Sequence, residues 1–427
     1  MYKDQHTLPD QKEVKTQGNC IRCGLCLAVC PTYREYLTET ASPRGRVELA
    51  SKGYAGEIVY TSNLAKQMYG CFGCMACDAI CPAGVRPSEL ILDMRNVYDL
   101  LYPATWKKYI FEGFIPKPGR MELVTLPLRI CERIGIRRWI YSFGKMRLIP
   151  KRLLDMEAML PQLLRHPLRQ VLPTVTQAYG ESRYRVGFFL GCAQSLLFAR
   201  ESAATVRVLA RNGCTVITPK EIICCGMPAT GYGRHDIAQA QARHNIAVFE
   251  DANIEAIITD CATCGSMLKS YAGLLEDDLE WSEKADGFSK KVHDISEFLV
   301  NMPLAKPRHR IEMRVTYHDP CHLRRGQGVW KEPRSLLHMI DGVDLVELPE
   351  ADWCCGSAGS QLITHYKLSR KVLQRKMDNL EATHAQTIAS GCPGCQMQLN
   401  VGVRQRGLPI QIIHPVQLLD WSYSGKR

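Results

Sequence analysis

The feature that most constrains this chain is a cysteine run that occurs twice near its start. The first copy extends from Cys20 to Pro31 and reads Cys-Ile-Arg-Cys-Gly-Leu-Cys-Leu-Ala-Val-Cys-Pro. The second copy extends from Cys71 to Pro82 and keeps the same spacing, C-x2-C-x2-C-x3-C-P. Two residues between thiols let a tight turn place three sulfurs around one face of a metal centre. The proline lacks an N–H and fixes φ, so it can redirect the chain away from that centre.

This spacing is the one found in bacterial ferredoxins, where three thiolates hold one 4Fe–4S cube and the fourth reaches the other cube. Two copies of the run are what this crossing-over requires. The ligands expected for the first cube are Cys20, Cys23, Cys26 and Cys81. Those expected for the second cube are Cys71, Cys74, Cys77 and Cys30. Zinc is the alternative, but zinc takes four ligands that usually come as two separated pairs, and each run packs four cysteines closely.

The composition favours a metalloprotein of a reducing compartment. The chain has 427 residues and 20 cysteines, and its polar residues 1–17 contain no apolar segment typical of a signal peptide. In the cytoplasm, clustered cysteines bind metal more often than they form disulfides. No uninterrupted apolar run is long enough to span a bilayer. We therefore expect a cytoplasmic protein, with peripheral association at the inner face of the membrane as the one further option.

The chain is basic, with a formal net charge of +11 from 54 Lys and Arg against 43 Asp and Glu. Two cubes with about two net negative charges each would lower this total to roughly +7. The remaining excess suits an acidic partner or an anionic membrane surface. Nucleic-acid binding is not expected, because no basic stripe with interleaved aromatic residues occurs. Arg44 and Arg46 either lie near the cubes or form a solvated turn.

From Tyr184 onward, a pattern of alternating strands and helices runs through twice. Strands are expected at residues 186–190, 215–218 and 256–259, and again at 314–317, 344–348 and 387–389. Helices are expected at 202–212, 237–249, 335–340 and 368–380. In both passes the cysteines follow strands. They are Cys192, Cys224, Cys225, Cys261 and Cys264 in the first pass, and Cys321, Cys354, Cys355, Cys392 and Cys395 in the second.

Equivalent cysteines are separated by a nearly constant distance, 129 residues from Cys192 to Cys321 and 131 from Cys264 to Cys395. This regularity indicates a duplicated unit with pseudo-twofold packing. Alternating strands and helices predict parallel sheets, which bind ligands at the carboxyl ends of their strands. We predict an α/β fold in four parts. They are a helical two-cluster ferredoxin-like domain over residues 1–100, a helical or irregular linker over 101–180, and α/β units over 181–310 and 311–427.

Ten cysteines in two identical layouts favour further iron–sulfur binding. A redox dithiol at Cys261 and Cys264 is possible chemistry, but it leaves the other three cysteines of the unit unexplained. His318 and His322 flank Cys321 and either act as ligand or proton donor, or only hydrogen-bond a sulfur or a carbonyl.

Three other side chains are expected to be structural. His365 and His414 have no partner in the sequence, and Cys131 is expected to be a small buried hydrophobe.

The order of a single cysteine, a Cys-Cys-Gly and a Cys-x2-Cys, present twice, resembles the CCG domain of heterodisulfide reductase catalytic subunits. The complete order of domains is similar to the iron–sulfur subunits of glycolate oxidase and its lactate-oxidising relatives. The stretches that carry this likeness are Cys30-Pro31-Thr32-Tyr33, Pro43-Arg44-Gly45-Arg46, Gly191-Cys192-Ala193-Gln194 and Trp353-Cys354-Cys355-Gly356-Ser357-Ala358-Gly359. The resemblance covers nearly the whole chain and is weakest at residues 101–180.

This resemblance implies an electron-transfer subunit that works beside FAD-binding subunits oxidising a 2-hydroxy acid, glycolate or lactate, and delivers electrons to a quinone or another carrier. It implies one or two further iron–sulfur clusters, cubane or non-cubane, held by the ten CCG cysteines. No FAD or NAD is expected on this chain, because no complete GxGxxG follows a strand. The alternative is a subunit that itself reduces a disulfide or related substrate at the CCG centres. Whether the chain is an enzyme on its own therefore stays open.

Overall fold

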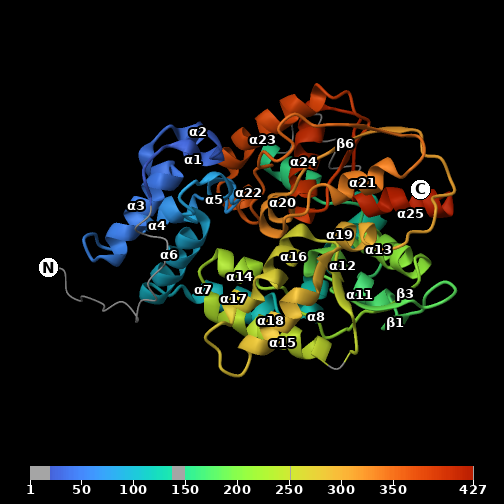
Figure 1. The fold of residues 1–427 in the computed structure, drawn as a ribbon. Helices are drawn as coiled ribbons and strands as arrows, with labels where there is room; N and C mark the ends of the chain where they lie inside the picture. The colour runs from blue at the N-terminus through green and yellow to red at the C-terminus, as the bar shows by residue number, and fades with distance from the viewer. Residues whose placement is uncertain (1–19, 137–149, 251, 427) are drawn as a thin grey trace.

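The structure is a computed structural model that describes residues 20–136, 150–250 and 252–426. Figure 1 shows a helical N-terminal domain, coloured blue, beside two α/β units that lie against each other. Residues 1–17, on which the expectation about a signal peptide rests, lie outside the described residues. Among the described residues, no helix combines the length and the apolar character that crossing a membrane requires.

The N-terminal domain consists of short helices around a small apolar core. They are α1 (Leu25–Ala28), α2 (Pro31–Tyr36), the 3-10 turn η2 (Glu39–Ala41), α3 (Pro43–Tyr54), α4 (Ser62–Tyr69), α5 (Ala76–Ile80) and α6 (Pro87–Leu101). α3 begins at Pro43, and the Ser42 hydroxyl caps it by accepting a hydrogen bond from the Gly45 amide. Val47, Met68 and Leu90 come from α3, α4 and α6 and are buried together. The helical domain predicted for this end of the chain is confirmed.

The segment between the domains is mostly helical in its described residues. It contains α7 (Thr105–Lys108), the π-helical turn η3 (Tyr109–Phe114), α8 (Pro118–Arg133), α10 (Lys151–Ala158) and α11 (Leu168–Val171). Cys131 lies on α8 and is only half-buried, so its predicted buried position is wrong. The physical reason is the position of α8 at the surface, where Ile130 and Ile134 beside this cysteine are exposed.

The first α/β unit has a five-stranded sheet in the order β1-β3-β2-β4-β5. Its strands are β1 (Val175–Thr176), β2 (Tyr184–Phe188), β3 (Cys214–Ile217), β4 (Ala256–Thr259) and β5 (Val292–Asp294). All neighbours are parallel except β1, which pairs antiparallel with β3. The helices are α12 (Cys192–Leu196), α13 (Ala199–Arg211), α14 (Met227–Gly231), α15 (His235–Glu250), α16 (Ala262–Lys269), α17 (Tyr271–Leu274), α18 (Ser282–Lys291) and α19 (Ile295–Val300).

The second unit repeats this topology with a four-stranded parallel sheet in the order β7-β6-β8-β9. Its strands are β6 (Met313–Tyr317), β7 (Val343–Val346), β8 (Thr387–Ala389) and β9 (Gln411–Ile413). Its helices are α20 (Cys321–Gln327), α21 (Glu332–His338), α22 (Gln361–Thr364), α23 (Tyr366–Glu381), α24 (Pro393–Arg406) and α25 (Pro415–Ser424). The order β7-β6-β8-β9 matches β3-β2-β4-β5 of the first unit, which confirms the predicted duplication.

The two units meet through equivalent helices. α13 of the first unit packs against α25 of the second, and α21 of the second packs against α19 of the first. Because α13 corresponds to α21 and α19 to α25 in the repeat, these two contacts are the same contact made twice, as a pseudo-twofold axis requires. Leu209, Leu299, Leu337 and Leu419 come from these four helices and share one buried core.

The N-terminal domain joins both units. α2 packs against α23 of the second unit, and α6 packs against α14 of the first (Figure 1). At the second of these joints, Lys107 on α7 lies 2.5 Å from Asp99 on α6, and both side chains are buried. The Lys107 ammonium also donates to the Tyr69 hydroxyl and to the Tyr232 carbonyl, each at 2.9 Å. One buried ion pair therefore ties the N-terminal domain, the linker and the first α/β unit together.

Candidate metal centres

The eight cysteines of the N-terminal runs surround two neighbouring cavities. The first cavity is lined by Cys20, Cys23, Cys26, Cys77 and Cys81. The second is lined by Cys30, Cys71, Cys74 and Cys77. The first cavity thus has three cysteines from the first run and two from the second, and the second cavity has three from the second run and one from the first, with Cys77 at both. The ligand sets of the two cubes stay predictions.

Arginines line both cavities. Arg44 borders the first cavity and makes an ion pair with Glu39 at 2.7 Å. Arg46 borders the second, is 2% exposed, and donates to the Thr32 hydroxyl at 3.0 Å and to the Gln67 carbonyl at 2.8 Å. Of the two readings of this segment, the structure favours cations beside the centres over a solvated turn.

The first CCG unit brings its five cysteines into one chain of thiol contacts. Cys192 begins α12 at the end of β2, the Cys224–Cys225 pair lies in the loop after β3, and Cys261 caps α16 after β4. Hydrogen bonds link Cys192 to Cys224 and Cys225 to Cys264. Cys225 also has a hydrogen bond with Cys224, and its bonds with the Cys224 and Cys264 thiols lower the pKa of Cys225 to about 6. Five soft sulfur donors at the carboxyl ends of parallel strands are a donor set that fits an iron–sulfur centre.

The second CCG unit repeats the arrangement at the ends of β6, β7 and β8. The Sγ atoms of Cys355 and Cys395 are 3.2 Å apart, and both side chains are buried. Hydrogen bonds also join Cys354 to Cys355 and Cys392 to Cys395. The bond from Cys395 lowers the pKa of Cys392 to about 7. Four thiols of this unit are therefore joined by hydrogen bonds, and Cys321 lies close enough to Cys355 and Cys392 to interact with them electrostatically.

A glycine with positive φ forms the turn after each cysteine pair. Gly226 has φ +99° and Gly356 has φ +86°, a conformation that lets two adjacent thiols face one site. At Gly356 a Cβ atom would lie 2.7 Å from the Ser369 carbonyl oxygen, which is backbone of the packed helix α23. A side chain is therefore excluded here by the conformation and by the neighbouring backbone.

We expect Gly356→Ala to lower thermal stability and the metal content of the second unit. Gly359→Ala is the matched control, because Gly359 also has positive φ, +63°, but a Cβ there meets nothing within 4 Å. Both variants pay about 1–2 kcal/mol for an L-residue in the left-handed region, and only Gly356→Ala adds the clash. Melting temperature and bound iron measure the difference. Equal losses in the two variants would show that the close approach to Ser369 is unimportant.

The four sites follow one another through the molecule. Cys77 lines both N-terminal cavities. The Cys354 thiol of the second unit hydrogen-bonds Cys74, which lowers the pKa of Cys74 to about 7. The hydroxyl of Thr263, in the Cys-x2-Cys segment of the first unit, lies 3.5 Å from the Cys392 Sγ. The order is the first cavity, the second cavity, the second CCG site and then the first CCG site.

The two ends of this row have different surroundings. Cys23 is exposed, so the first cavity opens toward solvent. At the other end, Ile115 and Met121 of the linker cover Cys192 and Cys224. The linker segment η3–α8 therefore forms part of the wall of the first CCG site.

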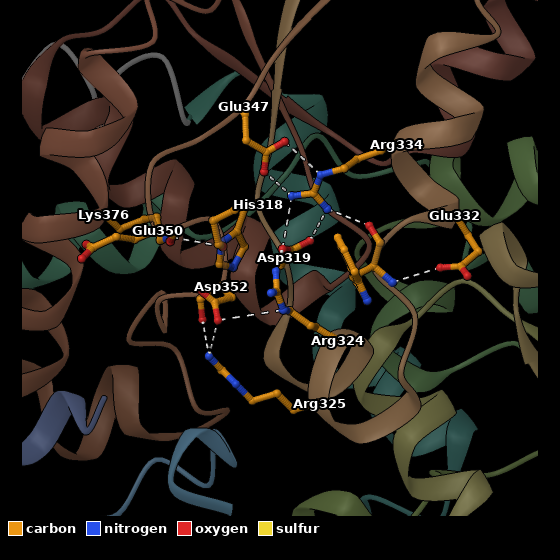
Figure 2. Close-up of polar contacts among 12 residues, drawn as sticks. His318, Asp319, Arg324, Arg325, Glu332, Arg334, Glu347, Glu350, Asp352 and Lys376 are labelled. Carbon is orange, nitrogen blue, oxygen red and sulfur yellow. Dashed lines mark hydrogen bonds and ion pairs between the residues drawn. The ribbon is translucent and has the colours of Figure 1, made fainter. Parts of the chain in front are cut away.

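Charged side chains form a network near His318, which lies beside Cys355 and Cys395 of the second CCG site. Figure 2 shows this network. Asp319 is 1% exposed and makes ion pairs of 2.7 Å with both Arg324 and Arg334. Arg325 pairs with Asp352 at 2.9 Å, and its guanidinium donates to the Cys74 carbonyl at 3.3 Å. This network ties the second unit to the second cavity of the N-terminal domain.

The ion-pair network was not predicted from the sequence. A signal existed in the comparison of the two repeats, because the buried strand of the first unit is followed by Phe189-Leu190-Gly191 whereas that of the second is followed by His318-Asp319-Pro320. Lys376 was also missed. Its fully buried ammonium donates to the carbonyls of Glu350 and Ala351, and burial lowers the pKa of Lys376 to about 8.

The histidines differ in position. His318 is 1% exposed beside Cys355 and Cys395, and His322 Nδ1 lies 3.3 Å from the Cys321 Sγ. Desolvation lowers the pKa of His322 to about 4, so that ring is neutral. His414 has the predicted structural role, since its Nδ1 accepts the Val416 amide at the start of α25. His365 precedes α23 and contacts the Thr364 hydroxyl through Nδ1 at 3.1 Å.

Comparison with known protein families gives three matches that together cover most of the chain. A cysteine-rich domain, CCG, matches residues 186–269 and 315–400. A 4Fe-4S dicluster domain matches residues 16–85. The linker region of the glycolate oxidase iron-sulfur subunit matches residues 103–160.

Individual relatives agree with these matches. The chain is 35% identical over 411 residues to the probable glycolate oxidase iron-sulfur subunit of Bacillus subtilis, covering 94% of this chain and 93% of the relative. It is 31% identical over 384 residues to the glycolate oxidase iron-sulfur subunit of Escherichia coli, covering 89% of each chain. Lactate utilization protein A of Halalkalibacterium halodurans is 31% identical over 237 residues, covering 55% of this chain and 96% of the relative. The chain belongs to the family of glycolate oxidase iron-sulfur subunits.

Proposed function

We propose that this chain transfers electrons between a flavin-containing subunit that oxidises a 2-hydroxy acid, glycolate or lactate, and a quinone or another carrier. The observation that carries the proposal is the row of four cysteine sites. Each site contacts the next through a named side chain, Cys77, then the Cys74–Cys354 pair, then Thr263 with Cys392. A flavin accepts two electrons at once and iron–sulfur centres pass them singly, so a row of such centres supplies the conversion between the two.

The cysteines fit the role that this proposal gives them. Cys20, Cys23, Cys26 and Cys81 would hold one 4Fe–4S cluster, and Cys71, Cys74, Cys77 and Cys30 the other. The CCG cysteines would hold one or two further clusters. The protein's own contribution is to bury these sulfurs, since Cys225, Cys264, Cys354 and Cys395 are all less than 9% exposed, and to place cations beside them. Burial and nearby charge are the means by which a protein sets the potential of such centres.

The burial of the CCG cysteines also bears on the alternative, direct reduction of a disulfide substrate. A disulfide must reach a sulfur or iron atom of the centre to react. Cys354 and Cys355 are 7% and 4% exposed, and the ferredoxin-like domain packs over Cys354 through Phe72 and Cys74. This enclosure favours a conduit for electrons over a site for a bulky substrate.

We place the oxidation of the hydroxy acid on a separate flavoprotein, since the chain carries no complete nucleotide-binding fingerprint. The linker helix α8 offers a surface for that partner. It covers the first CCG site through Met121, while Leu123 and Val124 are 67% and 59% exposed on its outer side. A reducing cytoplasm keeps the thiolates available, so we place the complex there.

The test is reduction of the chain by substrate with and without its partner. The full chain, isolated anaerobically, should show iron–sulfur absorbance that glycolate or lactate bleaches only after the flavoprotein has been added. Binding of the flavoprotein should also protect the amides of α8 from hydrogen exchange. Oxidation of the hydroxy acid by the isolated chain would overturn the proposal.

The crossing-over of the ferredoxin ligands gives a further prediction. Cys81→Ser should damage the cluster assigned to Cys20, Cys23 and Cys26, because Cys81 lines their cavity although it belongs to the other run. Electron paramagnetic resonance of the reduced protein resolves which cluster is lost. Cys131→Ser is the control, since Cys131 lies on α8 away from both cavities, and it should leave both signals intact. Loss of the other cluster in Cys81→Ser would reject the assignment.

A further inference from the structure

His318 stands where the two CCG units differ. It follows β6, three residues before Cys321, and the residue three before Cys192 in the first unit is Phe189. Phe189 is fully buried in the apolar core that contains Cys224, Cys225 and Cys261. The five cysteines are common to both units, so the imidazole is a donor that only the second unit has at this position.

The hydrogen bonding of His318 fixes which ring nitrogen is free. His318 Nδ1 lies 3.1 Å from the Ala351 carbonyl oxygen, which can only accept, so Nδ1 carries the proton. In a neutral imidazole the other nitrogen, Nε2, then presents a lone pair. This arrangement, with Nδ1–H held by a backbone carbonyl, is the usual one for a histidine that binds a metal through Nε2.

The free nitrogen is buried and has no nitrogen or oxygen partner among the described residues, and the side chain that it faces is the Cys355 thiol. His318 is 1% exposed, so water does not reach it freely. This buried lone pair therefore lies beside the thiol of a proposed iron ligand, where it can bind the same metal.

The surroundings of His318 indicate what that ligand is. A nitrogen of its ring and the Sγ atoms of Cys355 and Cys395 all lie within 4.8 Å of one another. Cys355 and Cys395 are 3.2 Å apart and belong to the set assigned to the second CCG centre. Figure 2 shows His318 at the middle of the charged network, where Asp319 pairs with Arg324 and Arg334. Among the described residues, no carboxylate is hydrogen-bonded to the imidazole.

We propose that Nε2 of His318 binds an iron of the second CCG centre, so that this centre has a nitrogen ligand that the first centre lacks. The inference rests on the proposed function, because it takes both CCG units to hold iron–sulfur centres. It makes the two centres chemically distinct although their cysteines are laid out alike. Imidazole nitrogen and thiolate sulfur are both established ligands of iron–sulfur centres.

The test is pulsed electron paramagnetic resonance of the full chain, isolated anaerobically, reduced, and labelled with 15N-histidine. We expect a nitrogen coupling of the size of a directly bound imidazole on the signal of the second centre. His318→Asn should abolish it. Asparagine can still donate to the Ala351 carbonyl, but it has no atom at the place of Nε2. His322→Ala is the matched control, because His322 is the other imidazole beside this centre, and it should keep the coupling.

The outcomes separate the inference from the function it rests on. Iron in the second unit without a histidine coupling, or a coupling that survives in His318→Asn or vanishes in His322→Ala, overturns the inference alone. Absence of iron from the second unit of the unmodified chain overturns the proposed centre as well. If His318→Asn loses the centre altogether, the nitrogen coupling is compared between the labelled unmodified chain and His322→Ala. A coupling present in both supports the inference, and a coupling absent from the unmodified chain overturns it.

Discussion

Cys355→Ser should interrupt the row of centres and stop electrons from passing between the ferredoxin-like domain and the first CCG unit. Cys355 is 4% exposed, its Sγ lies 3.2 Å from that of Cys395, and it belongs to the site that contacts Cys74 on one side and Thr263 on the other. Electron transfer slows steeply with distance, so removing a middle centre is worse than perturbing an end. We expect throughput from flavoprotein to acceptor to fall by at least about 100-fold, equivalent to about 2.7 kcal/mol on the barrier.

Steady-state acceptor reduction measures this loss, and spectroscopy of the reduced protein shows which centre has gone. The two ferredoxin clusters should persist, because their cysteines lie outside the second unit. Cys214→Ser is the matched control. Cys214 is a fully buried cysteine on β3 that belongs to none of the four sites, and its replacement should leave throughput within a few-fold of the original. Unchanged throughput in Cys355→Ser would mean that electrons do not cross the second centre.

Asp99→Ala should produce the largest loss of stability among single ion-pair changes outside the centres. Asp99 and Lys107 are 5% and 6% exposed and 2.5 Å apart, at the joint of the ferredoxin-like domain, the linker and the first α/β unit. Removing the carboxylate leaves a buried ammonium, and breaking such a pair costs about 3–5 kcal/mol. For units of 150–250 residues, about 2–4 °C of melting temperature is lost per kcal/mol, so we expect a drop of at least about 6 °C.

Asp344→Ala provides the comparison for this variant. Asp344 forms an ion pair of 3.4 Å with Arg314, and the side chains of Asp344 and Arg314 are 63% and 44% exposed. Exposed pairs contribute about 0–1 kcal/mol, so the melting temperature should hardly change. Thermal unfolding of both variants, followed by circular dichroism under anaerobic conditions, makes the comparison. Similar shifts in the two would show that the Asp99–Lys107 pair does not hold the three parts together.

The repeat was the part of the fold that the sequence predicted best. β4 and β8 have the predicted bounds, and the other predicted strands shift by one or two residues. Of these strands, β2, β3, β4, β6 and β8 are mostly buried and carry apolar runs. The edge strand β7 is only partly buried, and its apolar residues Val343, Leu345 and Val346 still indicated a strand. The strands β1, β5 and β9, which were missed, lie at sheet edges and are two or three residues long. α16 and α24 were also missed. They begin at the Cys-x2-Cys segments, where cysteine and glycine weaken the helical pattern.

Contacts between the parts of the chain could not be predicted from spacing. The hydrogen bond between Cys74 and Cys354 joins residues that lie far apart in the sequence, and it depends on how the ferredoxin-like domain packs on α23. The ion pairs of Asp319 depend on the orientations of α20 and α21. For His318 the sequence placed an imidazole near the cysteines, and only the structure distinguishes its bonded Nδ1 from its free Nε2.

The most direct test of the account is the iron and acid-labile sulfide content of the full chain isolated anaerobically. Two ferredoxin clusters alone would bring about eight irons per chain, and occupied CCG sites would raise both iron and sulfide above that number. All of the signals should respond to chemical reduction. A protein that contains zinc alone, or neither iron nor acid-labile sulfide, would contradict the claim that these cysteines form a path for electrons.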